Sequence, residues 1–229
     1  MSNFPPTRPS ILERIRTAAP EEKGAAFDDL ARGYWRPIHT YLRLKWSMDE
    51  HDAEDATQAF LQTAWEKSFF DSYDPAKARF RTFLRVCLDR FVMNRAAKDA
   101  AQRRGGGMTP VSMSHADSAR MVDDDDLFRQ EMVRDLFARA LEIVRAECER
   151  TGRMTAFRVF ELYDIDPADG VKYADLAQRF GVPTTQITNY LALARRLFRE
   201  AVVAELRLLC GDGDEFRAEV QALLGIEVA

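Results

Sequence analysis

Apolar residues recur every three or four positions along most of the chain, and strict apolar–polar alternation is nearly absent. This spacing is the period of amphipathic α-helices, so the sequence predicts an all-α fold. Helices are expected near Ile11, ending at Pro20, over 25–46 with an interruption near Pro37, and over 80–103. Further helices are expected over 127–149 and 154–163, from Tyr173 onward, and within 211–229.

The helical pattern stops at Gly105-Gly106-Gly107, and the next residues are rich in Gly, Ser and Asp up to Asp126. That composition is typical of a flexible linker, so two helical domains are expected. The predicted parts are an N-terminal extension (1–23), a first domain (24–105), a linker (106–127), a second domain (128–209) and a C-terminal tail (210–229).

Composition and charge narrow the class of protein to which the chain can belong. Of the 229 residues, 46% are hydrophobic and 31% charged, which is typical of a globular protein. The formal charge of -4 argues against a DNA-binding surface over the whole molecule. A local cluster of positive charge can still bind DNA on a protein with a negative net charge. No apolar run approaches the roughly 20 residues of a membrane span. Three scattered cysteines indicate reduced thiols, so a cytoplasmic protein with no membrane partner is expected.

The segment 52–65, which begins Asp-Ala-Glu-Asp, is the most informative part of the chain. At about 100° per residue a helix here has one acidic-polar face and one apolar face. The polar face holds Asp52, Asp55, Gln58, Gln62 and Glu66, and the apolar face holds Ala53, Ala56, Phe60, Leu61 and Ala64.

Residues 77–104 contain nine Lys or Arg and only two acidic residues, with aromatic residues at Phe69, Phe70, Tyr73 and Phe80 just before or at the start of the helix. Cations bind phosphates and aromatic rings stack on unpaired bases, so this segment suits DNA with a few bases turned out. The alternative is a solvated basic helix face with its aromatic residues in the core.

Residues 173–199 fit a helix-turn-helix, with Gly181 at a turn that favours positive φ. Pro183 or Thr184 would begin the second helix, which Val182, Ile187 and Leu191 would pack against the first. The start of that helix would face a major groove, and two arginines farther along would contact phosphates. The predicted contacts are Thr184, Thr185, Gln186, Thr188 and Asn189 for bases, and Arg195 and Arg196 for phosphates. An ordinary helical hairpin is the alternative.

These segments, in this order, resemble the extracytoplasmic-function sigma factors of bacterial RNA polymerase. The resemblance implies two helical sigma-type domains, with region 2-like residues at 24–105 and a region 4-like helix-turn-helix at 128–209. It implies that core polymerase is bound through Asp52, Asp55, Gln58, Leu61, Gln62 and Trp65. It implies promoter DNA contacts on the minus-ten side by Arg79, Arg81, Arg95, Lys98, Arg103 and Arg104, and on the minus-thirty-five side by the contacts named above.

The chain also departs from that family. Ala59 stands where an acidic residue is usual, and Thr188, Asn189 and Tyr190 stand where cations are usual. The run from Asp74 to Leu84 resembles a subgroup that a serine/threonine protein kinase controls. Its phosphorylated threonine matches Thr57, although helical phase alone places Thr57 on the buried side.

No catalytic, cofactor or metal site is expected. His39, His51 and His115 are scattered, and the sequence has no glycine-rich phosphate loop. The sequence therefore favours a sigma factor without activity of its own. The runner-up is a helix-turn-helix regulator that binds an operator without core polymerase, and a helical hydrolase or transferase ranks third.

Overall fold

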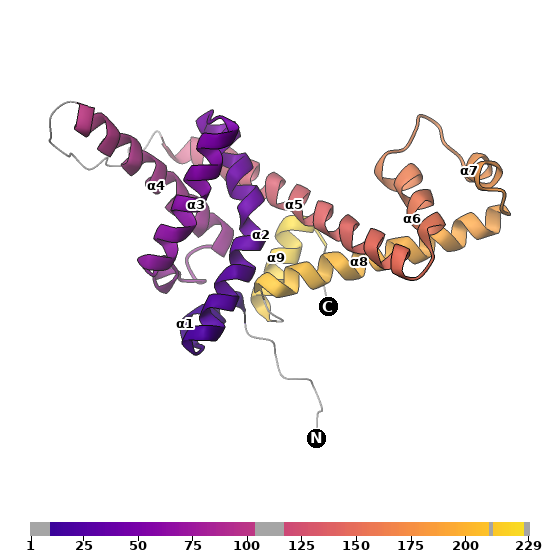
Figure 1. Cartoon of the computed structure of the whole chain (residues 1–229), viewed down its shortest axis with the longest axis horizontal. Helices are drawn as coiled ribbons and strands as arrows, with labels where there is room; N and C mark the ends of the chain where they lie inside the picture. The colour runs from indigo at the N-terminus through magenta and orange to yellow at the C-terminus, as the bar shows by residue number, and fades with distance from the viewer. Residues whose placement is uncertain (1–9, 104–116, 211–212, 227–229) are drawn as a thin grey trace, which may run out of the picture. The chain divides into compact units, whose positions relative to one another are not determined.

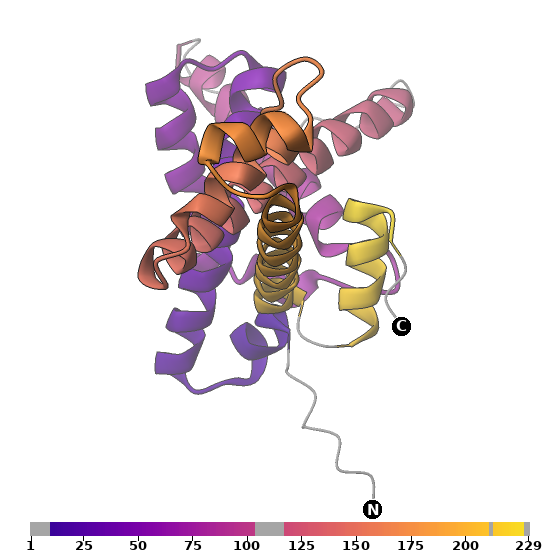
Figure 2. The ribbon, with the colours of Figure 1, turned by 90° about the vertical axis from the view of Figure 1, so that its right-hand side faces the viewer.

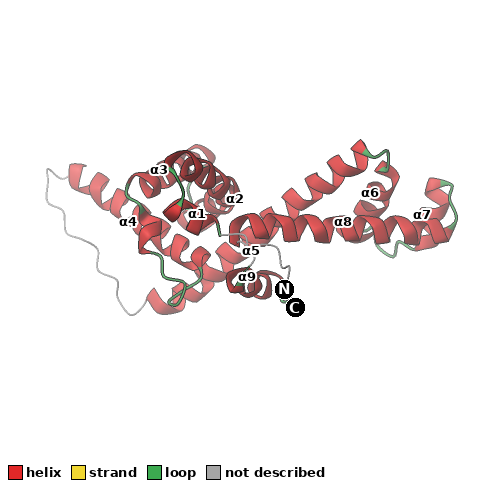
Figure 3. Cartoon of the chain, turned by 90° about the horizontal axis from the view of Figure 1, so that it is seen from below, coloured by secondary structure: helices red, strands yellow, loops and turns green. Residues whose placement is uncertain are grey.

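The computed structural model describes residues 10–103, 117–210 and 213–226, and every regular element in these ranges is a helix (Figures 1 and 3). The chain divides into two units: residues 1–135 together with 208–229, and residues 136–207. Each unit is described by itself below.

The first unit begins with four helices and a short 3-10 turn. They are α1 (Ile11–Thr17), α2 (Pro20–Trp46), α3 (Glu50–Glu66), η1 (Phe69–Ser72) and α4 (Phe80–Arg103). The side chain of Ser10 accepts a hydrogen bond from the Glu13 amide and caps α1, and Asp49 caps α3 in the same way through Asp52. These caps fix where the two helices start.

Helix α2 differs from its prediction at both prolines. It starts at Pro20, not near residue 25, because proline at the first helical position lacks only an amide that would have no helical partner. Pro37 lies inside the helix and does not end it. Pro37 is buried beside Ile38 and Tyr41, so core packing outweighs the lost hydrogen bond.

The core of this unit is aliphatic and aromatic. Leu30, Ile38, Phe60, Leu84 and Leu88 are fully buried. Aromatic rings join the helices: the centroids of Phe60 and Phe91 lie 5.6 Å apart, edge to face, which ties α3 to α4. The apolar face predicted for the segment 52–65 is therefore the face that α3 buries.

Two long helices belong to both units. Helix α5 (Asp117–Arg150) starts ten residues before the predicted helix, so residues 117–127 of the expected linker are helical. Helix α8 (Thr184–Cys210) continues into the first unit at Leu208. The C-terminal helix α9 (Asp214–Leu224), expected in a separate tail, belongs to the first unit and lies beside α4 (Figure 2).

The second unit comprises the remainder of α5, α6 (Met154–Phe160), a π-helical turn η2 (Glu161–Ile165), α7 (Tyr173–Phe180) and most of α8. Helix α7 ends at Gly181, whose φ of 64° confirms the predicted left-handed turn, and α8 begins at Thr184. The hydrophobic core of the second unit includes Leu176, Ile187 and Leu191, and Val182 packs at its edge, as the helical phase predicts.

Candidate functional site

The outer face of α3 is a continuous polar strip. Asp52, Asp55, Gln58 and Gln62 are exposed, and Trp65 is 42% exposed at the end of the strip. Leu61 does not belong to this face. Its side chain is only 4% exposed because it lies on the buried side of the helix.

Local contacts hold this strip in place. The ring of Trp65 packs on that of Phe27 with centroids 4.9 Å apart, and Gln62 donates a 2.8 Å hydrogen bond to Glu66. His51 lies 3.8 Å from Asp55. All of these groups except Phe27 are exposed, so the strip can meet a partner without a change in the fold.

Thr57 lies on the opposite side of α3, with no exposed surface. Its hydroxyl donates a 2.7 Å hydrogen bond to the carbonyl oxygen of Ala53, one turn earlier. In this conformation a kinase cannot reach the hydroxyl, and a phosphate would have to enter the core beside Phe60. Any phosphorylation at Thr57 therefore requires α3 to move away from the rest of the unit.

The basic residues on and next to α4 divide into exposed and buried groups. Arg79, Arg95 and Lys98 are exposed, as a DNA-contacting role requires. Arg81 is only 4% exposed, and its Nη1 lies 2.6 Å from Oε1 of Glu219, so it is not part of an open basic face. The side chain of Arg103 and the whole of Arg104 lie outside the described residues.

The acidic run that ends the expected linker docks onto α2 and α4. Nζ of Lys45 lies 2.5 Å from Asp124 and 2.9 Å from Asp89, and Arg85 bridges Asp89 and Asp125 at 2.9 Å each. Arg85 is 1% exposed, so these pairs form a network around a buried guanidinium, with half-buried partners at its edge. The network also receives hydrogen bonds from Tyr41, Trp46 and Thr82. The sequence signal for it was four consecutive aspartates after an unusually basic helix.

The aromatic residues ahead of α4 are mostly core residues. Phe70, Tyr73 and Phe80 are 2%, 7% and 7% exposed, and Arg16 donates hydrogen bonds to the carbonyl oxygens of Phe70 and Tyr73. The prediction that this loop offers rings to flipped bases does not fit this conformation. The alternative of core aromatics describes Phe70 and Tyr73 correctly.

In the second unit the start of α8 is open to a partner. Thr184, Thr185, Thr188 and Asn189 are exposed, and Gln186 is half-buried. None of the first-turn residues is acidic, so the positive end of the helix dipole is not neutralised from within α8.

The two arginines expected to bind phosphates already have partners. Nε and Nη2 of Arg195 each lie 2.8 Å from Asp164 in η2, a bidentate pair that raises the pKa of the guanidinium. Arg196 pairs with Glu200 at 2.9 Å, one turn along α8. Phosphate binding by either residue must compete with, or share, these contacts.

Metal clusters and membrane spans are two further features to consider in residues 10–103, 117–210 and 213–226. These ranges hold no group of three His, Cys, Asp or Glu residues that could bind a metal ion. No helix within them is long and apolar enough to cross a membrane. No protein-family model matches the chain, and a search of curated proteins found no match.

Proposed function

We propose that this protein is a sigma-type initiation factor, which binds core RNA polymerase through α3 and promoter DNA through α4 and the start of α8. The observation that carries the proposal is the strip on α3. An Asp-Ala-Glu-Asp helix presents Asp52, Asp55, Gln58 and Gln62 outward from a buried apolar face, at the spacing that resembles the polymerase-binding helix of sigma factors.

The charge distribution supports the division of roles. The α3 strip is acidic and suits a basic protein surface, whereas Arg79, just before α4, and Arg95 and Lys98 on α4 suit phosphates. At the start of α8, exposed hydroxyl and amide groups suit base edges in a major groove. An acidic strip and cationic surfaces on one chain fit a protein that binds polymerase and DNA together.

Control by a serine/threonine kinase at Thr57 is part of the same proposal. The buried hydroxyl adds a constraint: phosphorylation captures a conformation in which α3 has separated from its packing partners. The phosphate adds about 1.5 to 2 negative charges, which would oppose the return of Thr57 to the core and add to the acidity of α3.

The test is co-purification with core polymerase. The double variant Asp52→Asn, Asp55→Asn neutralises two exposed carboxylates with little change in shape, and we expect it to weaken polymerase binding about tenfold or more. The matched control is Glu142→Gln, Glu149→Gln, which removes the same charge from exposed sites on α5. A reduction of polymerase binding in the α3 variant alone, together with specific run-off transcripts from the wild type, supports the proposal.

A different set of results would support the second candidate function, an operator-binding regulator. If neither the wild type nor its phosphorylated form binds core polymerase, but the protein alone binds duplex DNA at palindromic half-sites, it is an operator-binding regulator. Equal polymerase binding by the α3 variant and the α5 control contradicts the assignment of the α3 strip.

A further inference from the structure

The C-terminal segment that the structure describes, residues 208–210 and 213–224, packs on the rest of the first unit at Gly33 in α2. Leu209 lies against Gly33, where an added Cβ would stand 2.6 Å from its Cδ2 atom. Phe216, Val220 and Leu223 of α9 are buried. The segment is therefore a folded part of this unit, held mainly by apolar contacts.

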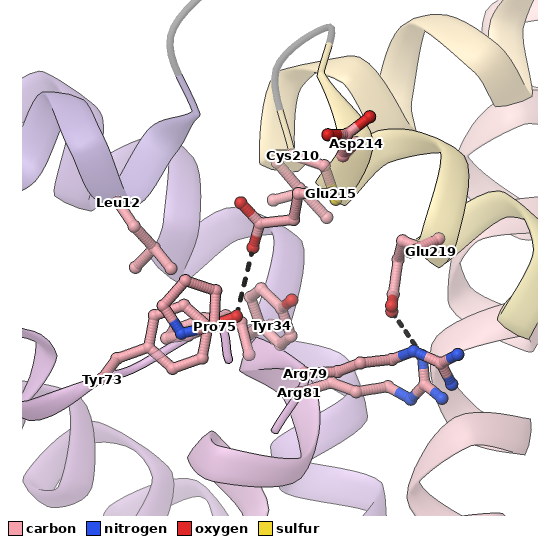
Figure 4. A pocket seen from close by; sticks show the side chains of 13 residues that line it. Leu12, Tyr34, Tyr73, Pro75, Arg79, Arg81, Cys210, Asp214, Glu215 and Glu219 are labelled. Carbon is pink, nitrogen blue, oxygen red and sulfur yellow. Dashed lines mark hydrogen bonds and ion pairs between the residues drawn. The ribbon is translucent and has the colours of Figure 1, made fainter. Parts of the chain in front are cut away.

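The polar contacts of α9 are made by acidic side chains, which face a basic and an aromatic side chain of the first unit. Glu219 reaches the buried guanidinium of Arg81 at 2.6 Å, and the hydroxyl of Tyr73 donates a 3.4 Å hydrogen bond to Glu215 (Figure 4). Nε of Arg81 is buried and makes no hydrogen bond within the described chain. The contact thus contains a buried ion pair that is incompletely satisfied, which makes it weaker than a fully bonded pair.

The packing beneath α9 is also incomplete. A cavity of about 240 Å³ lies between the helix and the unit, lined by Tyr34, Tyr73, Phe80, Arg81 and Cys210 among others (Figure 4). Side chains that line a cavity lose dispersion contacts on that side. A helix that docks over an unfilled gap and through an incompletely hydrogen-bonded ion pair is a candidate for local release without unfolding of the unit.

We propose that α9 is a reversible acidic cover over a cationic and aromatic surface, and that nucleic acid binds this surface when α9 lifts. While α9 is docked, the carboxylates of Glu215 and Glu219 occupy the positions that phosphate groups would take after its release. Release would expose Arg81 beside the already exposed Arg79, together with the rings of Tyr73 and Phe80, a combination that suits unpaired DNA. The inference rests on the proposed DNA-binding function, but its test needs no polymerase.

Cys210 reports whether α9 is docked. It lies at the end of α8, is 8% exposed and lines the cavity under α9. Burial raises the pKa of its thiol well above the ordinary value, so a disulfide reagent should label the docked state slowly and label faster when the cover opens. Cys148, buried in the second unit, reports on opening of that unit. Mass spectrometry of the labelled peptides separates the two sites.

The key variant is Gly33→Ala, which pushes against Leu209 without a change in charge. Overpacking of this kind should raise the opening equilibrium, and hence Cys210 labelling, roughly ten- to hundredfold. Gly24→Ala is the matched control, because Gly24 is on the same helix and a Cβ there meets nothing within 4 Å. Glu219→Gln is the second variant, which weakens the pair with Arg81 and keeps the side-chain shape.

DNA binding is measured by fluorescence anisotropy with a labelled single strand of about 15 nucleotides. Gly33→Ala should bind it more tightly than the wild type and Gly24→Ala, with a steeper salt dependence as Arg81 becomes available. If Gly33→Ala loses its helical circular dichroism, the first unit has unfolded, and Glu219→Gln becomes the deciding variant. For that variant the salt slope must steepen, because a lost negative charge elsewhere would change affinity alone.

Two results overturn the proposal. One is Cys210 labelling at the wild-type rate in both variants, which would make α9 a permanent part of the core. The other is faster labelling with no gain in DNA affinity or salt slope, which would make the exposed surface irrelevant to nucleic acid. Failure of polymerase binding in the separate α3 experiment affects neither measurement.

Discussion

Replacing Thr57 by glutamate, the usual imitation of phosphothreonine, should destabilise this protein rather than activate it. Thr57 has no exposed surface, and its hydroxyl is already bonded to Ala53. Glutamate is larger, so overpacking costs about 1–3 kcal/mol. A buried carboxyl without partners costs about another 1–3 kcal/mol. The expected loss of about 2–6 kcal/mol is a large part of the 5–15 kcal/mol that folded domains typically have.

The assay is urea unfolding followed by circular dichroism, with two comparisons. Thr57→Val keeps the volume and loses only a hydroxyl whose acceptor is within the helix, so its stability should change by less than about 1 kcal/mol. Thr63→Glu is the matched control on α3, because Thr63 makes the same 2.7 Å bond to the carbonyl one turn earlier but is half-buried. It should cost less than Thr57→Glu by at least about 1 kcal/mol.

A Thr57→Glu protein as stable as the wild type would refute this reasoning, because it would mean that the core around position 57 accepts a charge. If the loss occurs, glutamate cannot test phosphorylation in the folded state. Kinase-treated protein must then be used, and hydrogen exchange of α3 amides should show whether the phosphate holds this helix open.

Three further outcomes are expected. Burial raises the pKa of Glu215, so the protonated carboxyl is favoured in the folded state. The stability that Glu215 contributes should therefore be greatest below the ordinary Glu pKa and decline as pH rises through the raised pKa. Urea unfolding of Glu215→Gln across this pH range should lack that decline. Gly181→Ala should cost about 1 kcal/mol in thermal unfolding because its φ is 64°, whereas Gly24→Ala, inside α2, should be neutral or stabilising. A double-mutant cycle of Arg85→Met and Asp125→Asn should give a coupling free energy of about 0.5–3 kcal/mol, and a value near zero would contradict the buried network.

Helical periodicity was sufficient for the positions of most helices. The apolar spacing in α3 identified the buried face of that helix, since residues three or four apart share a face. The turn at Gly181 was predictable because glycine readily adopts the left-handed conformation that ends α7. Pro20 and Pro37 were misread, because a proline can begin a helix or be tolerated inside one when packing compensates.

Side-chain partners were harder to predict because they depend on segments distant in sequence. Arg81 reads as a basic surface residue until Glu219, 138 positions later, is placed beside it. Asp124 and Asp125 read as linker residues until Lys45 and Arg85 are found under them. Composition records how many charges a segment carries, but not which of them another segment neutralises.

These pairings change what the charge pattern implies about DNA. Of the cations predicted to bind DNA, Arg81, Arg195 and Arg196 are each held by a carboxylate of the same chain. The partner of Arg196 is exposed and screened, so phosphate can displace it at little cost. The partner of Arg81 belongs to a helix that must move first. If Arg81 contacts DNA as proposed, that contact is coupled to the docking of α9, whereas binding by the start of α8 would need only local exchange of ion pairs. If the protein binds promoters as proposed, the first unit rather than the second is where a regulatory signal can act.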